Sequence, residues 1–279
     1  MNKLSLDRQA QIIKALCEGN PIRSTARITG TAVNTVVKLL RDVGIACVEY
    51  QDKHLRDLPC ERIQCDEIWS FCYAKQKNVP EDKQGQFGYG DVYTWVALDA
   101  DTKLVASWLV GLRDAYHAHE FMKDLQVRLS NKVQLTTDGH TAYLYAVEDT
   151  FGSEIDFAQL VKLYGHPEVV KDARYSPDQC TGCTPHKIQG NPDPKHISTS
   201  YVERQNLTMR MSMRRFTRLT NAFSKKIENH ALAIALHFMY YNFARPHKSL
   251  ANPYPRTPAM AVGITNHVWT IEEIVSLMR

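Results

Sequence analysis

The stretch that decides the fold class is RIQCDEIWSFCYAK, residues 62–75, because it is the first segment of the chain that reads as a β-strand. Apolar and aromatic side chains fill most of its positions, and the acid Asp66 stands among them. Residues 92–111, VYTWVALDADTKLVASWLVG, read as two further strands around Asp-Ala-Asp-Thr, since Asp and Thr favour tight reversals. The three strands are predicted to form a meander.

A helix and a fourth strand extend this pattern. Residues 115–129 place Phe121 and Leu125 on one helical face, and residues 133–143 read as a strand that ends in polar side chains. Strands that alternate with helices in this way predict an α/β domain with a mixed sheet flanked by helices. Residues 165–197 are rich in Pro and Gly and lack periodicity, so an insertion or long surface loop is expected there.

The chain before this domain has a helical pattern. Residues 6–44 are predicted to form three short helices, which end at Gly19, Gly30 and Gly44. A short helix, a tight turn and a longer helix are typical of a helix-turn-helix, whose second helix enters the major groove of DNA. A plain three-helix bundle explains the same pattern. Under the first interpretation the DNA-facing side chains are Thr31, Asn34, Thr35, Lys38 and Arg41.

The composition is that of a globular protein with a modest bulk charge. The 279 residues carry a formal charge of +4, which alone does not indicate a nucleic-acid partner. The N-terminus lacks the apolar segment of a signal peptide, and no uninterrupted apolar run reaches membrane-spanning length. Seven cysteines without an export signal favour a reduced cytosolic environment over a disulfide framework.

Cations are concentrated in one short segment, where helix is expected from Thr199 to about Thr220. Between Ile197 and Thr220 there are five arginines and a single carboxylate, Glu203. A cluster with so few alternating acids is typical of a surface that contacts phosphates rather than of a solvated helix face. The DNA-facing cations predicted from this segment are Arg204, Arg214, Arg215 and Arg218.

Three acids in the chain are candidates for catalysis. Asp66 lies among strand residues, where a charged acid needs a partner such as a metal ion. Asp138 follows the end of a strand, where sites collect in α/β sheets, although Asp-Gly is also an ordinary turn. Glu203 lies three residues after Ser200, as in a capping box, and Arg210 shares its helix face two turns later. Helix capping and metal binding are both open for Glu203.

Separated acids of this kind are what two-metal phosphoryl transfer requires. Hard divalent ions such as Mg²⁺ take oxygen ligands, and Mn²⁺ satisfies the same oxygens. Two such ions about 4 Å apart activate an attacking oxygen and stabilise the leaving one. The sequence therefore predicts that Asp66, Asp138 and Glu203 bind two Mg²⁺ ions and catalyse phosphoryl transfer.

The segments around these acids resemble the DDE transposases of bacterial insertion sequences, most closely the insertion-sequence-one family. The resemblance implies a ribonuclease-H-like catalytic core in which Asp66, Asp138, Glu203 and Arg210 are the acids and the arginine of the family's site. One departure is the lack of the N-terminal zinc-ribbon cysteines found in the shorter, two-frame elements of that group. The matching segments are QCDEIWSF at 64–71, TTDGHTAYLYAVEDTFG at 136–152, IDFAQLVKLYG at 155–165, YVERQNLTMRMSMRRFTRLTNAFSKK at 201–226, and HFMYYNFARPHKSL with TPAMAVGI within 237–264.

The resemblance implies a DNA transposase that cleaves the ends of an insertion sequence and joins them to target double-stranded DNA. A homodimer or larger assembly on DNA, in the bacterial cytoplasm at the nucleoid, is expected. A hydrolytic DNA nuclease on the same core and a domesticated DNA-binding regulator are the alternatives. The expected parts are a helix-turn-helix domain at 1–47, a linker at 48–62, the catalytic domain at 63–250 with an insertion at about 165–197, and a C-terminal tail at 251–279.

A second metal pattern lies in the insertion. Cys180-Thr-Gly-Cys183, with His186 and His196 nearby, has the residue types of a zinc site, two thiols followed by imidazoles. The histidine spacing is irregular for a zinc finger, and a loop without metal explains the same residues.

Overall fold

The centre of the protein is a mixed six-stranded sheet. The computed structural model describes residues 4–165, 179–217, 220–250 and 252–279. Across the sheet the strands follow the order β3-β2-β1-β4-β5-β6. The strands are β1 (Arg62–Cys72), β2 (Gly90–Asp99), β3 (Val105–Gly111), β4 (Val133–Asp138), β5 (Ile155–Gly165) and β6 (Gln179–Gln189).

Strand directions define the fold class. β1, β2 and β3 form an antiparallel meander, β4 and β5 run parallel to β1, and β6 runs antiparallel to β5. A meander continued on the β1 side by parallel strands is the ribonuclease-H-like arrangement. The α/β fold with a mixed sheet flanked by helices, which the sequence predicts, is therefore confirmed.

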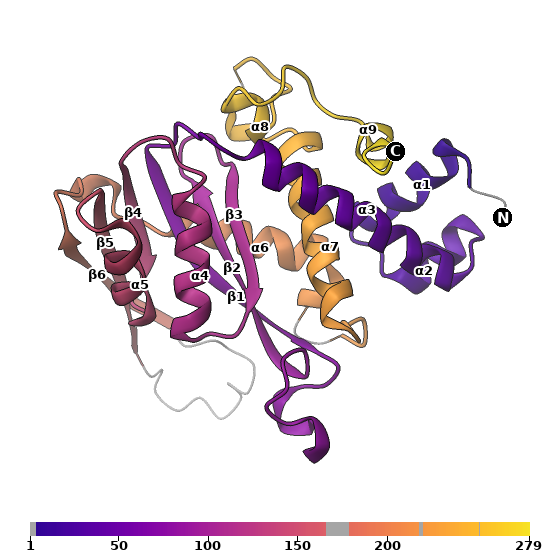
Figure 1. The fold of residues 1–279 in the computed structure, drawn as a ribbon, viewed down its shortest axis with the longest axis horizontal. Helices are drawn as coiled ribbons and strands as arrows, with labels where there is room; N and C mark the ends of the chain where they lie inside the picture. The colour runs from indigo at the N-terminus through magenta and orange to yellow at the C-terminus, as the bar shows by residue number, and fades with distance from the viewer. Residues whose placement is uncertain (1–3, 166–178, 218–219, 251) are drawn as a thin grey trace.

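Helices cover both faces of the sheet (Figure 1). On one face, Trp95 of β2 packs against Phe121 and Tyr143, with ring centroids 5.8 and 5.4 Å away. On the other face, Trp108 of β3 packs against Phe238 at 5.8 Å. The helices of the first face are α4 (Ala115–Gln126) and α5 (Ala142–Phe151), and those of the second are α6 (Ser200–Ser212) and α7 (Ile227–Met239).

The N-terminal helices are joined to the core differently from the prediction. They are α1 (Leu6–Cys17), α2 (Ile22–Thr29) and α3 (Val33–His54). α3 does not end at Gly44 but continues for another ten residues to His54, and it lies along α7. Its buried side chains belong to the same hydrophobic core as the sheet. Residues 48–54 of the expected linker are therefore part of a packed helix.

Gly44 is the point where α3 approaches α7. A Cβ at this position would lie 2.7 Å from Cβ and 2.8 Å from the carbonyl oxygen of Leu232. The glycine therefore permits a close crossing of the two helices. The packing of α3 on α7 keeps the chain helical at this position, although glycine has a low helical propensity.

Residues 179–189 correct the expected loop, because they form the edge strand β6. Residues 166–178 of the predicted insertion lie outside the described residues, and a 3₁₀ turn (Pro194–His196) follows β6. The expected helix from Thr199 to Thr220 is shorter as well. α6 ends at Ser212, and a single 3₁₀ turn (Arg214–Phe216) follows.

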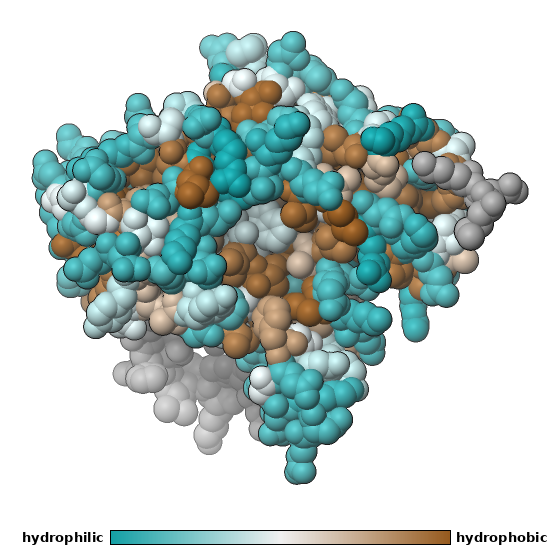
Figure 2. All heavy atoms as spheres, in the orientation of Figure 1, coloured by the Kyte–Doolittle hydropathy of each residue, from teal (hydrophilic) through white to brown (hydrophobic). Residues whose placement is uncertain are grey.

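The C-terminal tail packs onto the N-terminal helices. α8 (Pro258–Ala261) and α9 (Ile271–Ser276) end the chain, and α9 lies beside α1. The Trp269 ring is 5.0 Å from that of Tyr50 in α3. On the visible face hydrophilic side chains cover most of the surface, and hydrophobic ones gather near its middle (Figure 2). Within the described part of the chain, no helix combines the length and apolar character needed to cross a membrane.

Candidate active site

Strand register brings Asp66 and Asp138 together. β1 and β4 are parallel neighbours with Cys65 opposite Thr137, so the next residue on each strand is one of the two acids. β4 ends at Asp138, whose Oδ1 accepts a hydrogen bond of 3.0 Å from the backbone N–H of His140. The predicted turn role and the predicted place at the strand end both describe this residue.

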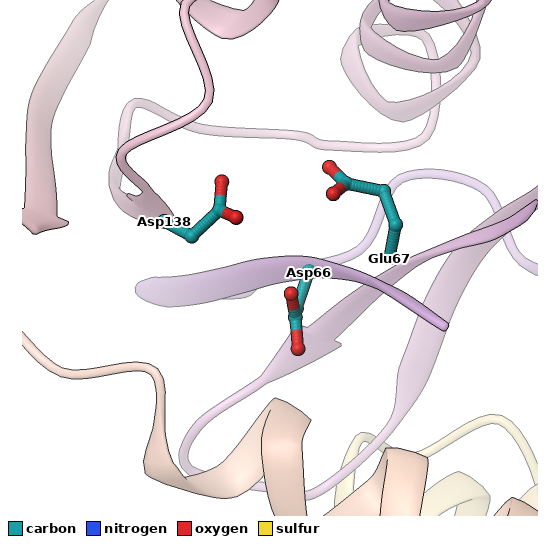
Figure 3. A group of neighbouring side chains, drawn as sticks. All are labelled: Asp66, Glu67 and Asp138. Atoms are coloured by element: carbon teal, nitrogen blue, oxygen red, sulfur yellow. The ribbon is translucent and has the colours of Figure 1, made fainter. Parts of the chain in front are cut away.

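Glu67 is a third acid at this position, and the sequence-based prediction missed it. Ligand oxygens of Asp66, Glu67 and Asp138 lie within 4.8 Å of one another. Figure 3 shows the carboxylates of Glu67 and Asp138 pointing toward each other, while Asp66 points to the opposite side of β1. The signal that could have revealed Glu67 is its place beside Asp66 in a buried strand.

Arg113 connects Glu67 and Asp138. Its guanidinium donates to Glu67 Oε2 at 3.0 Å and to Asp138 Oδ2 at 3.1 Å. The Glu67 side chain is only 2% exposed. Burial raises the pKa of Glu67 to about 7, and the charge of Asp138 adds to the rise, while Tyr143 and Arg113 oppose it. The single positive charge of Arg113 thus offsets the negative charges of both Glu67 and Asp138, where little water is available to do so.

Asp66 faces α6. Its Oδ2 accepts a hydrogen bond of 2.9 Å from Asn206 Nδ2. Burial raises the pKa of Asp66 to about 6, with further contributions from the charges of Asp138 and then Glu203, while its hydrogen bonds oppose the rise. The acids therefore repel one another when they are all ionised, and a cation among them would relieve the repulsion.

Gln64 fixes the start of α6 over β1. Side chains alternate between the faces of a strand, so Gln64 and Asp66 point to the same face. The Gln64 Oε1 accepts hydrogen bonds from the backbone N–H groups of Tyr201 at 2.8 Å and Val202 at 3.2 Å. Two of the N–H groups that a helix start leaves without intrahelical partners are satisfied in this way. Two neighbouring side chains of β1 therefore hold the helix that carries Glu203.

Glu203 is near the other acids but is not in their cluster. Its Oε1 accepts a hydrogen bond of 2.5 Å from Lys162 of β5 and another from the hydroxyl of Thr199. The cap residue of α6 is Thr199, so the predicted capping box at Ser200 is not formed. The charge of Glu203 nevertheless contributes to the raised pKa of Asp66. Arg210, in the last turn of α6, is half-buried.

The cluster fits a hard divalent cation. It is the one place in the described ranges where three side chains of metal-binding type converge. All its donors are carboxylate oxygens, which Mg²⁺ and Mn²⁺ prefer. Among the described residues no well-aligned donor reaches the buried Glu67 Oε1. An oxygen-only donor set with raised carboxyl pKa values is what a site for such an ion requires.

The predicted zinc set is not assembled. The Sγ atoms of Cys180 and Cys183 lie 3.8 Å apart on β6, but His196 lies elsewhere, with its Nδ1 2.5 Å from the guanidinium of Arg62. His186 follows Cys183 on β6 by three positions, an odd number that places the two side chains on opposite faces of a strand. The four residues therefore form no common site in the described structure.

The predicted DNA-facing residues of α2–α3 lie at the surface. Asn34, Lys38 and Arg41 are exposed and Thr31 and Thr35 are half-buried, and Lys38 is paired with Asp42. Of the later cations, Arg204 and Arg214 are exposed and Arg218 lies outside the described residues.

Arg215, another of the predicted DNA-facing cations, is half-buried and is bound within the chain. Its guanidinium donates to Ser224 Oγ at 2.9 Å and to the carbonyl of Asn229 at 3.1 Å. Burial lowers its pKa to about 10. Ser224 in turn contacts His230, so Arg215 joins the segment after α6 to the start of α7.

A cleft of about 810 Å³ separates the N-terminal helices from the segments that follow α6. Val33 and Val37 of α3 line one wall, and cationic side chains lie on both sides. The cations are Arg23, Arg214, Arg215 and Lys225.

Comparisons with known proteins give distant similarities. No protein-family model matches the sequence, and no curated protein matches it. Similar solved structures include a piggyBac transposase synaptic complex with hairpin DNA, with a TM-score of 0.43, 10% identity and coverage of 100% of this chain and 73% of that one. Others are the Mos1 strand transfer complex (TM-score 0.26, 12% identity, 86% and 78% covered) and the Mos1 mariner paired end complex with Mn (0.24, 10%, 86% and 77%). Similarities of this size define neither the family nor the activity of the chain.

Proposed function

We propose that this chain is a DDE transposase of the insertion-sequence-one type, which cleaves the ends of a mobile element and joins them to target DNA. The observation that carries the proposal is the meeting of Asp66 and Asp138 on neighbouring parallel strands of a ribonuclease-H-like sheet, beneath the helix that bears Glu203. Because two element ends must be joined, the proposed working form on DNA is a dimer or larger assembly.

The residues have distinct proposed roles. Asp66, Asp138 and Glu203, with Glu67 beside them, would hold Mg²⁺ or Mn²⁺. Bound there, such ions lower the pKa of an attacking hydroxyl and stabilise charge on the departing oxygen. Asn206 orients the Asp66 carboxylate, and Arg113 orients that of Asp138. Lys162 compensates the charge of Glu203 before a cation is bound. Arg210 is proposed to contact the phosphate that undergoes reaction.

DNA is proposed to contact two surfaces. Asn34, Lys38 and Arg41 on the exposed side of α3 would read an element end in the major groove, as in a helix-turn-helix. The cations Arg23, Arg214 and Lys225 of the cleft would bind backbone phosphates between that helix and the catalytic residues. Much of the affinity is then expected to come from counterion release and to fall steeply with salt.

The test uses the full chain and the DNA that flanks its gene. Element ends with free 3′-hydroxyls are incubated with a target plasmid and Mg²⁺ or Mn²⁺, and joined products are expected. Asp66→Asn and Asp138→Asn should abolish joining while they retain DNA binding. Cut DNA without joined products would identify a hydrolytic nuclease. DNA binding that needs no metal, with neither cleavage nor joining of the DNA, would identify a regulator.

A further inference from the structure

Two of the seven cysteines differ from the rest in accessibility. Cys180 and Cys183 on β6 are exposed, and all the others are buried. Burial raises the pKa of the thiols at Cys17, Cys47, Cys60, Cys65 and Cys72. Thiol chemistry with solutes is therefore confined to the pair on β6, since a thiolate and access are both needed.

A β-bulge brings these two thiols to the same face. In a regular strand, residues three apart point to opposite faces. In β6, however, Cys180 lies opposite Tyr164 and Cys183 lies opposite Lys162, two positions along β5, so Thr181 is an extra residue. The Sγ atoms are consequently 3.8 Å apart, and a disulfide of about 2.0 Å requires only a small closing movement.

The thiol pair adjoins the candidate active site. Lys162, the register partner of Cys183, contacts Glu203 through its ammonium group. The hydrogen bond with Cys180 raises the pKa of the Cys183 thiol, while the nearby charge of Lys162 acts in the opposite direction. Cys180, Cys183, Lys162 and Glu203 are thus electrostatic neighbours on one face of the sheet.

We propose that Cys180 and Cys183 are a site of reversible oxidation, where a low-molecular-weight disulfide such as glutathione disulfide converts the dithiol into an internal disulfide. Cys180 attacks the small disulfide, forms a mixed disulfide and releases one thiol. Cys183 then attacks the Cys180 sulfur and releases the second thiol. Both cysteine protons leave with the two released thiols, so two cysteines are oxidised and one small disulfide is reduced.

The test measures the mass of the tryptic peptide that contains both cysteines. The reduced full-length protein is incubated with glutathione disulfide, and the tryptic peptide of residues 175–187, which contains no other cysteine, is analysed. The wild-type peptide should lose two hydrogen masses, resist alkylation and recover with reductant. Cys180→Ser and Cys183→Ser should each retain one glutathione instead. A wild-type peptide that stays reduced, or that keeps glutathione without closing, would overturn the proposal, as would single-cysteine variants that take no glutathione.

Discussion

Asp66 and Glu67 are adjacent in sequence and point to opposite sides of one strand. Each nevertheless has a carboxylate oxygen within 4.8 Å of one on Asp138. Such a pair is poorly solvated, and each carboxyl holds its proton more tightly than in the unfolded chain. The arrangement therefore stores electrostatic repulsion at neutral pH, which a cation among the oxygens would remove.

The raised pKa values of the two carboxyls, caused first by burial and then by the neighbouring charges, predict a pH dependence of stability. Folded pKa values of about 6 for Asp66 and about 7 for Glu67 exceed the unfolded ones. The folded state therefore binds more protons, and the contribution of these groups to the free energy of unfolding is full below about pH 4 and lost as the pH rises to about 7. Urea unfolding without metal should show this loss, and the double variant Asp66→Asn, Glu67→Gln should show a flatter profile. Identical profiles would contradict the assignment.

Asn206 gives a second prediction at the level of single residues. Its amide orients Asp66 through one hydrogen bond, so Asn206→Ala should weaken Mn²⁺ binding about tenfold or more. Thr208→Ala is the matched control, because within the described ranges the Thr208 hydroxyl bonds only to the backbone of its own helix at Arg204. Calorimetry on both variants checks the difference. Equal losses would mean that the helix, not the amide, determines the affinity.

How much of the site could be predicted depends on how local its signals are. Asp66 could be selected as a candidate because it stands within an apolar strand pattern, and Asp138 because it lies where a strand pattern ends. For Glu67 the only local signal was its place beside Asp66 in a buried strand, and alternation along that strand points its side chain away from Asp66. Its nearness to Asp138 and Arg113 depends on the fold. The partner of Glu203 was not predictable either: Lys162 reaches it from β5, and no local pattern encodes a contact across 41 positions.

Among the elements, α6 depends on β1 for its position. Gln64→Ala would leave the N–H groups of Tyr201 and Val202 without this acceptor, which should cost about 1–3 kcal/mol and displace Glu203. Gln134→Ala is a close control, because Gln134 also binds backbone from a strand, at Asp193. Both variants should lose stability in urea, but only Gln64→Ala should also lose strand joining. Normal joining by Gln64→Ala would show that α6 keeps its place without this side chain.

Element boundaries were predicted least well where tertiary contacts override local preference. Gly44 reads as a helix stop, but packing on α7 carries α3 through it to His54. Residues 179–189 read as a loop because of Pro185, Gly182 and the cysteines, yet pairing with β5 makes them a strand, with a bulge that sequence periodicity does not reveal.

At the scale of the whole molecule, the crossing of α3 and α7 joins the N-terminal helices to the domain that contains the sheet. Gly44→Ala should improve helical propensity but force a methyl group against Leu232, with a net loss of about 1–3 kcal/mol. Glu49→Ala, at an exposed position of the same helix, should change stability little. Urea unfolding distinguishes the two. A stabilised Gly44→Ala protein would show that the helices do not approach this closely.

The length of α3 has a consequence for the choice of the scissile bond. Its 22 residues span about 33 Å, close to one turn of B-form DNA. The exposed side chains near its start and Gly44, where α3 packs on α7, belong to one rigid helix. Under the proposed function this helix would fix the distance between the recognised bases and the cleaved bond. Under the proposed function the offset between them is a fixed number of base pairs, and inserting a helical turn into α3 would move the cut along the element rather than abolish it.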